Sequence, residues 1–121
     1  MYLSERPDDL ALVTAALKAV AEPTRLRILK SLEVGELCAC KIVELVGLSQ
    51  PTVSRHLAVL RAAGLVTERK DGRWTHYRTS ADAAGFRARL LSLLDTWGGE
   101  DDVITRDWRR AEELRRSPAR T

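Results

Sequence analysis

The 121-residue sequence has only two cysteines, Cys38 and Cys40, and no apolar run that approaches the length of a membrane-spanning helix. Because cysteines one residue apart cannot cross-link distant parts of a chain, the pattern excludes a disulfide-stapled fold. The first residues also lack the pattern of a signal peptide. We therefore expect a cytoplasmic protein with a single core, reduced thiols and no membrane partner.

Charge of one sign is also not in large excess, since the formal net charge is only +3. Its distribution is more informative. The segment from Ser49 to Arg78 has a net charge of +4, which leaves −1 for the rest of the chain. Its charged residues are Arg55, Arg61, Arg69, Lys70, Arg73 and Arg78 against Glu68 and Asp71. A basic segment is typical of a surface that meets DNA, although a solvated basic face explains it equally well.

Hydrophobic spacing predicts helices followed by a hairpin and further helices. Asp71-Gly72 between two alternating segments indicates a type I′ turn, which needs positive φ at both residues. We predict a mainly α fold with a small β-hairpin, a winged helix-turn-helix. The expected helices cover about residues 10–20, 23–34, 38–46, 50–63, 86–97 and 103–114, and the strands 65–70 and 73–78. We divide the chain into a DNA-binding and dimerisation domain, 1–97, and a helical extension with a frayed end, 98–121.

The helix predicted from residue 50 has the pattern of a DNA recognition helix. Ser49 is a good N-cap, Pro51 is tolerated in the first turn, and an apolar stripe can face the core. The polar side chains at or near the opposite face can bind base edges or phosphates, and the hairpin adds cations beside the groove. The candidate DNA-binding residues are Gln50, Thr52, Ser54, Arg55 and His56 on the helix and Arg69, Lys70 and Arg73 on the hairpin.

Three segments together resemble the ArsR/SmtB family of bacterial winged-helix repressors: residues 21–29 (AEPTRLRIL), 36–40 (ELCAC) and 48–57 (LSQPTVSRHL). The similarity covers roughly residues 9–97. It implies a homodimer that pairs through its first and last helices and binds a palindromic operator in double-stranded DNA. It also implies release from DNA by a metal ion, a metalloid or an oxidant. The 86–97 stripe and the first helix are the expected dimer surface.

The Cys38-Ala39-Cys40 segment is similar to the arsenic- and antimony-sensing branch of that family. The resemblance implies As(III) or Sb(III) as the inducer, bound by Cys38 and Cys40, with no cofactor needed for DNA binding. Lys41 departs from the aspartate of the branch's motif, and Val43 stands where some members carry a third cysteine. Since residues two apart on a regular helix point about 200° away from each other, we expect ligand binding to unwind the start of the third helix.

The sequence is also compatible with other functions. The same cysteines could sense oxidants through reversible oxidation. A small thiol metallochaperone is a more distant alternative, and a winged helix that binds protein is another. An enzyme is not expected, because no base or orienting group is placed near the cysteines. The two histidines, His56 and His76, do not suggest a metal pair, and we expect His76 to be solvated.

Overall fold

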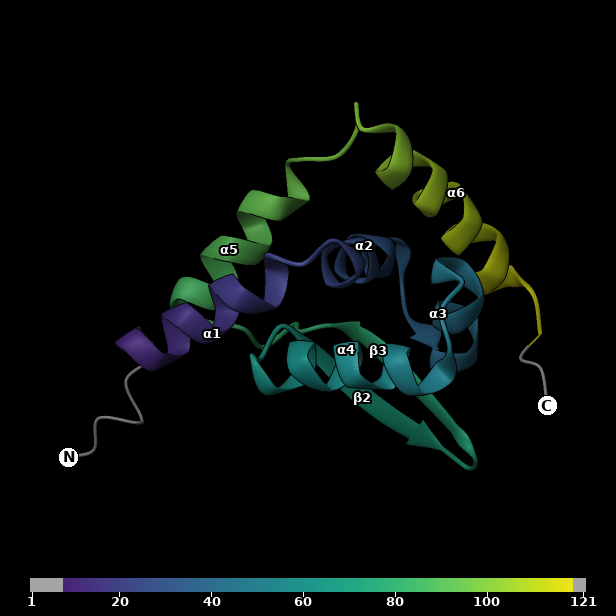
Figure 1. Ribbon diagram of the computed structural model, residues 1–121, viewed down its shortest axis with the longest axis horizontal. Helices are drawn as coiled ribbons and strands as arrows, with labels where there is room; N and C mark the ends of the chain where they lie inside the picture. Colours follow the sequence, from purple (N-terminus) through teal and green to yellow (C-terminus); the bar gives the residue numbers. More distant parts are fainter. Residues whose placement is uncertain (1–7, 119–121) are drawn as a thin grey trace.

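The computed structural model describes residues 8–118 and consists mainly of helices with one small sheet (Figure 1). None of its helices has the length and apolar character needed to cross a membrane. The elements, in chain order, are α1 (Leu10–Val20), α2 (Pro23–Ser31), η2 (Leu32–Val34), β1 (Leu37–Cys38), α3 (Ala39–Val46), α4 (Gln50–Ala62), β2 (Val66–Asp71), β3 (Trp74–Thr79), α5 (Gly85–Asp95) and α6 (Asp102–Arg116).

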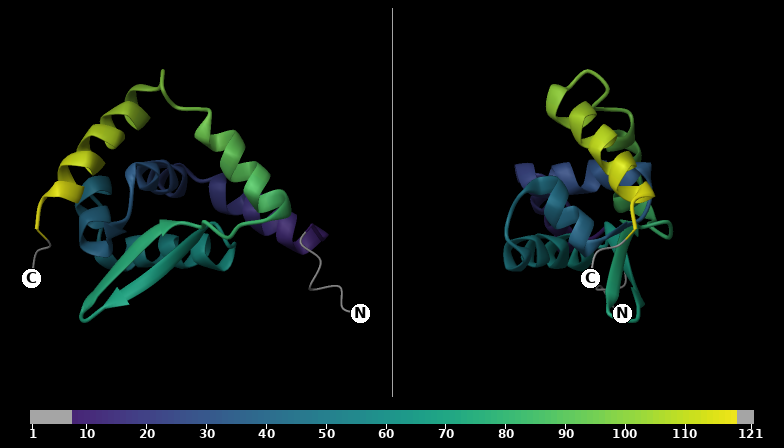
Figure 2. Two further views of the ribbon diagram at one scale, coloured as in Figure 1. Left: turned by 180° about the vertical axis from the view of Figure 1, so that it is seen from behind. Right: turned by 90° about the vertical axis from the view of Figure 1, so that its right-hand side faces the viewer.

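Helix α2 lies at the centre of the molecule. Helices α5 and α6 form an arch on one side of it, while α4 and the hairpin lie on the other (Figures 1 and 2). Ile28 and Leu29 of α2 are buried together with Leu57 and Leu60 of α4. This shared core fixes the position of α4 relative to the rest of the chain.

The turn between α3 and α4 forms where the sequence predicts it. Gly47 ends α3 in the left-handed conformation, with φ of 72°, which glycine adopts without a steric cost. Ser49 then caps α4 by accepting a hydrogen bond from the Thr52 amide. Gly47 and Ser49 thus end one helix and begin the next at the positions that the sequence predicts.

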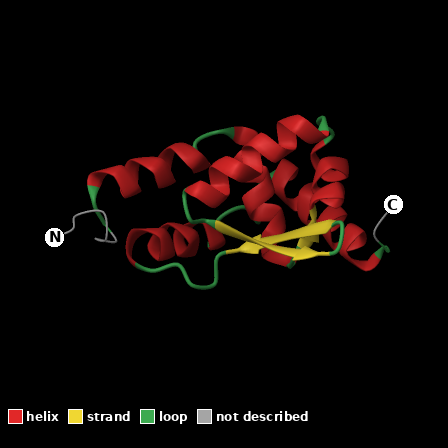
Figure 3. Cartoon of the chain, turned by 90° about the horizontal axis from the view of Figure 1, so that it is seen from below, coloured by secondary structure: helices red, strands yellow, loops and turns green. Residues whose placement is uncertain are grey.

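The sheet has three antiparallel strands in the order β1-β3-β2, rather than the two expected (Figure 3). The predicted turn is also wrong by one residue. Asp71 pairs with Trp74, so Gly72 and Arg73 form the loop, and only Gly72 has positive φ. Positive φ at the first loop residue alone fits a type II′ turn, which accepts a non-glycine residue at its second position.

Helix α1 buries its small residues in the core and leaves two of its leucines open to solvent. Ala16 and Ala19 of α1 are fully buried, whereas Leu10 and Leu17 are exposed. The small alanines allow α1 to approach its neighbours closely, and Val20 is partly buried against the same core. Helix α5, which packs against α1, likewise exposes Leu93. An unpartnered apolar surface therefore lies on the α1–α5 side of the molecule.

Helix α6 shares the core of the preceding helices. Its residues Ala111 and Leu114 belong to the same hydrophobic cluster as α2 and α4, and the helix packs on α2 and α3. Buried Asp107 forms a two-point ion pair with Arg27 of α2, at 2.8 and 3.1 Å. The predicted boundary at residues 97–98 falls at the bend between α5 and α6. The last three residues of the expected frayed end lie outside the described residues.

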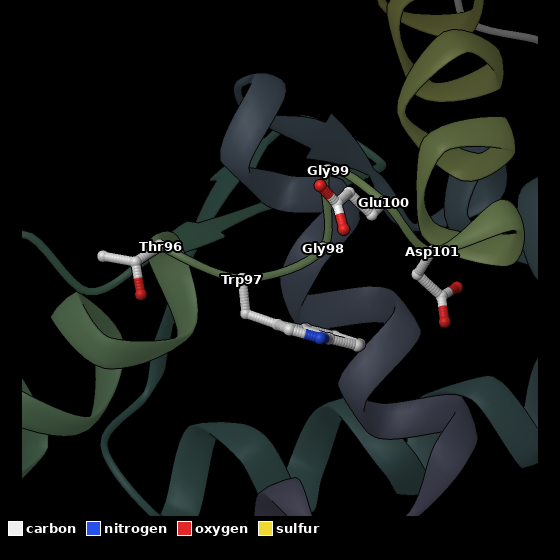
Figure 4. Close-up of a pocket in the computed structure, with 6 residues that line it drawn as sticks. All are labelled: Thr96, Trp97, Gly98, Gly99, Glu100 and Asp101. Carbon is white, nitrogen blue, oxygen red and sulfur yellow. The ribbon is translucent and has the colours of Figure 1, made fainter.

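A fully buried lysine, Lys30, stabilises the bend between α5 and α6. The Lys30 ammonium donates to the backbone oxygens of Leu94 and Trp97 and pairs with Glu33 at 2.8 Å. It also lies 5.7 and 5.3 Å from the ring centres of Trp97 and Trp108. Figure 4 shows the loop 96–101 that it holds, which lines a shallow cavity of about 500 Å³.

Candidate nucleic-acid interface and thiol site

The first turn of α4 presents an ordered polar surface. The Ser49 hydroxyl donates to Thr52 Oγ1 at 2.9 Å, and Arg55 Nη2 donates to the same oxygen at 3.3 Å. Gln50, Ser54 and Arg55 are exposed, and Thr52 is half-buried. The opposite side of the helix carries the buried stripe Val53, Leu57 and Leu60. The predicted polar face is thus open to solvent, with its arginine held by the first turn.

His56 lies apart from this face. Its ring is half-buried, and Nδ1 lies 3.4 Å from Nη1 of Arg25. The Arg25 side chain also donates to the backbone oxygens of Lys18 and Ala19 at the end of α1. His56 therefore lies at the joint between α1, α2 and α4.

The β2–β3 hairpin, residues 66–79, is the wing of this fold. The three cations predicted on it differ in their partners. Lys70 and Arg73 are exposed, and neither forms an ion pair within the described part of the chain. Arg69 instead donates to Glu36 through Nη2 and Nε, at 2.6 and 3.2 Å. This hydrogen-bonded guanidinium lowers the pKa of Glu36 below its ordinary value, so the carboxylate is charged at neutral pH.

The two cysteines are not arranged as a regular helix would place them. Cys38 is the extended N-cap residue of α3, and its sulfur accepts a hydrogen bond from the Cys40 amide at 3.3 Å. Folding back in this way brings the two Sγ atoms to 2.6 Å from each other. The expectation that a shared ligand must unwind the helix is therefore wrong, because Cys38 precedes the first turn.

The surroundings of the thiols also differ from expectation. Cys38 is 3% exposed, and its backbone pairs with His76 of β3, which is half-buried rather than solvated. Lys41 donates to the Ser117 oxygen at the end of α6, at 2.6 Å. Within residues 8–118 no three cysteine, histidine or acidic side chains gather to hold a metal ion. The cysteines thus provide two adjacent soft donors.

Residues 22–68, which include the thiols and α4, match the family described as "Bacterial regulatory protein, arsR family". The chain is 41% identical over 88 residues to the arsenical resistance operon repressor of Escherichia coli (strain K12), covering 72% of this chain and 74% of the relative. The chain belongs to the arsR family. It is also 37% identical to the nodulation protein NolR of Rhizobium meliloti, over 83% of this chain and 80% of the relative.

Solved structures agree with this ArsR-family assignment. HlyU from Vibrio cholerae matches with a TM-score of 0.61 and 35% identity, over 71% of this chain and 90% of that chain. A winged helix-turn-helix domain from Mycobacterium bovis, described as homodimeric, matches with a TM-score of 0.63 and 33% identity, over 72% and 78%. The predicted winged helix-turn-helix fold is confirmed.

The sequence did not predict the side-chain contacts that link distant segments of this ArsR-family chain. Glu36 lies within the segment that carried the resemblance, yet its partner Arg69 is 33 residues away. Arg25 likewise binds His56 across 31 residues. A local pattern gives no signal for such pairs, because they depend on how strands and helices pack.

Proposed function

We propose that this ArsR-family protein is a homodimeric repressor that leaves its operator when trivalent arsenic or antimony binds Cys38 and Cys40. The observation that carries the proposal is that Cys38 folds back over the start of α3, so that its sulfur adjoins that of Cys40 at the base of a winged helix. Relatives described as arsenical resistance operon repressors in E. coli and Staphylococcus aureus, 41% and 44% identical, support the choice of ligand. Its place of action is the cytoplasm, where DNA is present.

Helix α4 enters the major groove in this proposal. Gln50, Thr52, Ser54 and Arg55 read base edges and phosphates, with His56 behind them. Lys70 and Arg73, joined by Arg69, contact the phosphates beside the groove. Two such subunits reach half-sites about 34 Å apart in a palindromic operator.

The exposed α1–α5 surface supports the dimer. Leu10 is 80% exposed and Leu93 is 65% exposed, and both lie on helices that pack against each other. Large apolar side chains left open on adjacent helices mark an interaction surface. A second copy of the chain covers this surface in the proposed repressor, as the homodimeric M. bovis relative suggests.

Thiolates are soft ligands that suit a thiophilic metalloid. When arsenous acid binds, two As–S bonds replace two As–O bonds, and the two thiol protons leave with the two hydroxyls as water. The third hydroxyl remains on arsenic or is exchanged in the same way for a small thiol. Because the protein supplies two sulfurs, we expect sensing to depend on the concentration of such a thiol. DNA binding itself needs no cofactor.

The decisive test uses Cys38→Ser, Cys40→Ser and the double variant on labelled operator DNA. Each variant should bind the operator as the wild type does, because serine also serves as an N-cap and neither thiol lies on the polar face of α4. Each should stay bound when arsenite or antimonite is added, whereas the wild type dissociates. Release of the double variant by arsenite would contradict the proposal.

Oxidation is a second candidate signal, favoured by the same closeness of the sulfurs. Peroxide would convert the two thiols to a disulfide and two waters. Release of the wild type by peroxide but not by arsenite, lost in both serine variants, would select this alternative.

A further inference from the structure

The thiol site and the wing meet in one row of residues across the sheet. Cys38 pairs with His76 in β1 and β3, and Arg69 pairs with the same His76 in β2 and β3. Residues directly opposite each other on neighbouring strands carry their side chains on the same face of a sheet. Cys38, His76 and Arg69 therefore share a face, with one histidine between the sensor and a wing cation.

Glu36 links the thiol end of this row to the wing cation Arg69. It lies two residues before Cys38, and its carboxylate binds the Arg69 guanidinium through two hydrogen bonds, at 2.6 and 3.2 Å. A two-point contact between a guanidinium and a carboxylate fixes orientation as well as charge. The other acidic group near this cation, Asp71, lies 4.0 Å from Arg69 Nη1, so Glu36 is the main partner.

The state of Arg69 sets it apart from the other wing cations. Lys70 and Arg73 have no carboxylate partner in residues 8–118 and are free to meet phosphates. Arg69 directs Nε and Nη2 at that carboxylate, so a phosphate can take the same two-point contact only by displacing Glu36. Phosphate and Glu36 thus compete for the same guanidinium.

We propose that Glu36 is a positioning residue that couples the thiol site to DNA by competing with a backbone phosphate for Arg69. A ligand held by both Cys38 and Cys40 anchors the N-cap residue of α3 and keeps β1 in register on β3. In that arrangement Glu36 retains Arg69, and the phosphate loses its cation. Ligand and DNA therefore weaken each other's binding by the same factor. This inference rests on the proposed function.

The experiment compares wild type, Glu36→Gln, Glu36→Asp and Arg69→Ala by fluorescence anisotropy on labelled operator, with and without arsenite, over a salt series. Glu36→Gln should bind DNA several-fold more tightly, because Arg69 is released to the phosphate. The factor by which arsenite weakens DNA binding should fall at least tenfold in Glu36→Gln and in Arg69→Ala. Glu36→Asp should restore much of that factor. Arsenite binding, followed by protection of the thiols from a thiol reagent, should stay unchanged.

Glu44→Gln is the matched control. Glu44 is an acidic residue of α3 whose carboxylate binds Arg110 at 2.8 Å, and its side chain is about as exposed as that of Glu36, 34% against 30%. The same change of charge there should leave both the DNA affinity and the effect of arsenite as in the wild type. A Glu36→Gln protein released by arsenite as strongly as the wild type would overturn the inference.

A failure of the proposed function gives a different result. If arsenite binds but does not release the wild type, or does not bind at all, the metalloid proposal fails on the wild type alone. The competition for Arg69 is then judged by DNA affinity without ligand. Tighter binding by Glu36→Gln, with a steeper salt dependence that Arg69→Ala reverses, supports it. Unchanged binding overturns it.

Discussion

Helix α6 and the surface formed by α4 and the wing are both rich in arginine, but they use it differently. Helix α6 has five arginines and four carboxylates, and four of those arginines form ion pairs: Arg106, Arg110, Arg115 and Arg116. On the other surface, Arg61 and Arg69 are paired with carboxylates, but three cations are not. Arg55 contacts a threonine hydroxyl, and Lys70 and Arg73 have no ion pair in the part of the chain that the structure describes.

The difference shows that the number of basic residues does not locate a DNA-binding surface. A cation already paired with a carboxylate must lose that partner before it can bind a phosphate. An unpaired exposed cation pays no such cost and attracts the polyanion directly. The unpaired cations therefore support the proposed DNA-binding role of the α4–wing surface, and the ion pairs of α6 favour a structural role for that helix.

The largest effect is expected when the recognition surface itself is removed. Gln50→Ala together with Arg55→Ala should weaken operator binding by about 2–6 kcal/mol per subunit, at roughly 1–3 kcal/mol for each base contact. Binding to random DNA should change much less, so the ratio of the two affinities should fall. Competition titrations with operator and random duplexes measure that ratio. An unchanged ratio would contradict the assignment of the α4 face.

The structural role of α6 is tested at Asp107. Asp107→Asn keeps the shape but removes the charge that faces Arg27, and its side chain is 3% exposed. Breaking a buried ion pair is costly, and because Arg27 is partly exposed we expect a loss of about 1–3 kcal/mol in the free energy of unfolding. Urea denaturation measures it. The folded variant should bind operator as the wild type does, and a selective loss of DNA binding would show that α6 contributes to that surface.

The unpaired wing cations are tested by Arg73→Ala. Losing one phosphate contact should reduce the slope of log affinity against log salt by about 0.9 per subunit. At 0.1 M salt this corresponds to about 1 kcal/mol per subunit, equal for operator and random DNA. A salt series with both duplexes provides the measurement. An effect confined to the operator would mean that Arg73 reads a base instead.

Much of the fold could be predicted because its signals are local. Gly47 and Ser49 define the turn before α4, and the apolar stripe of α4 is buried as its spacing indicates. The strand β1 and the burial of Lys30 against the bend between α5 and α6 could not be predicted, since both depend on partners far along the chain. The helix predicted over residues 10–20 is confirmed as α1, but spacing alone does not say which of its apolar side chains face the core and which could face a second subunit.

The candidate site also has features that the sequence predicts and features that it does not. The pair Cys38 and Cys40 and the polar residues of α4 are visible in the sequence because each set is contiguous. The sequence did not reveal that the two sulfurs lie close together, because this depends on Cys38 adopting an extended N-cap conformation rather than a helical one. The hydrogen bond from Arg69 to Glu36 depends on the order of strands in the sheet, which no local pattern reveals.

The smallest effect is expected at a paired arginine of α6. Arg110 contacts Glu44 at 2.8 Å and Glu113 at 3.3 Å, and its side chain is 44% exposed. Exposed ion pairs contribute little because water screens them, so Arg110→Ala should lower the free energy of unfolding by about 0.5 kcal/mol. Operator affinity and its salt dependence should match the wild type, although the variant loses the same charge as Arg73→Ala. A reduced salt slope in Arg110→Ala would show that paired arginines also bind DNA, and the distinction between the two surfaces would then fail.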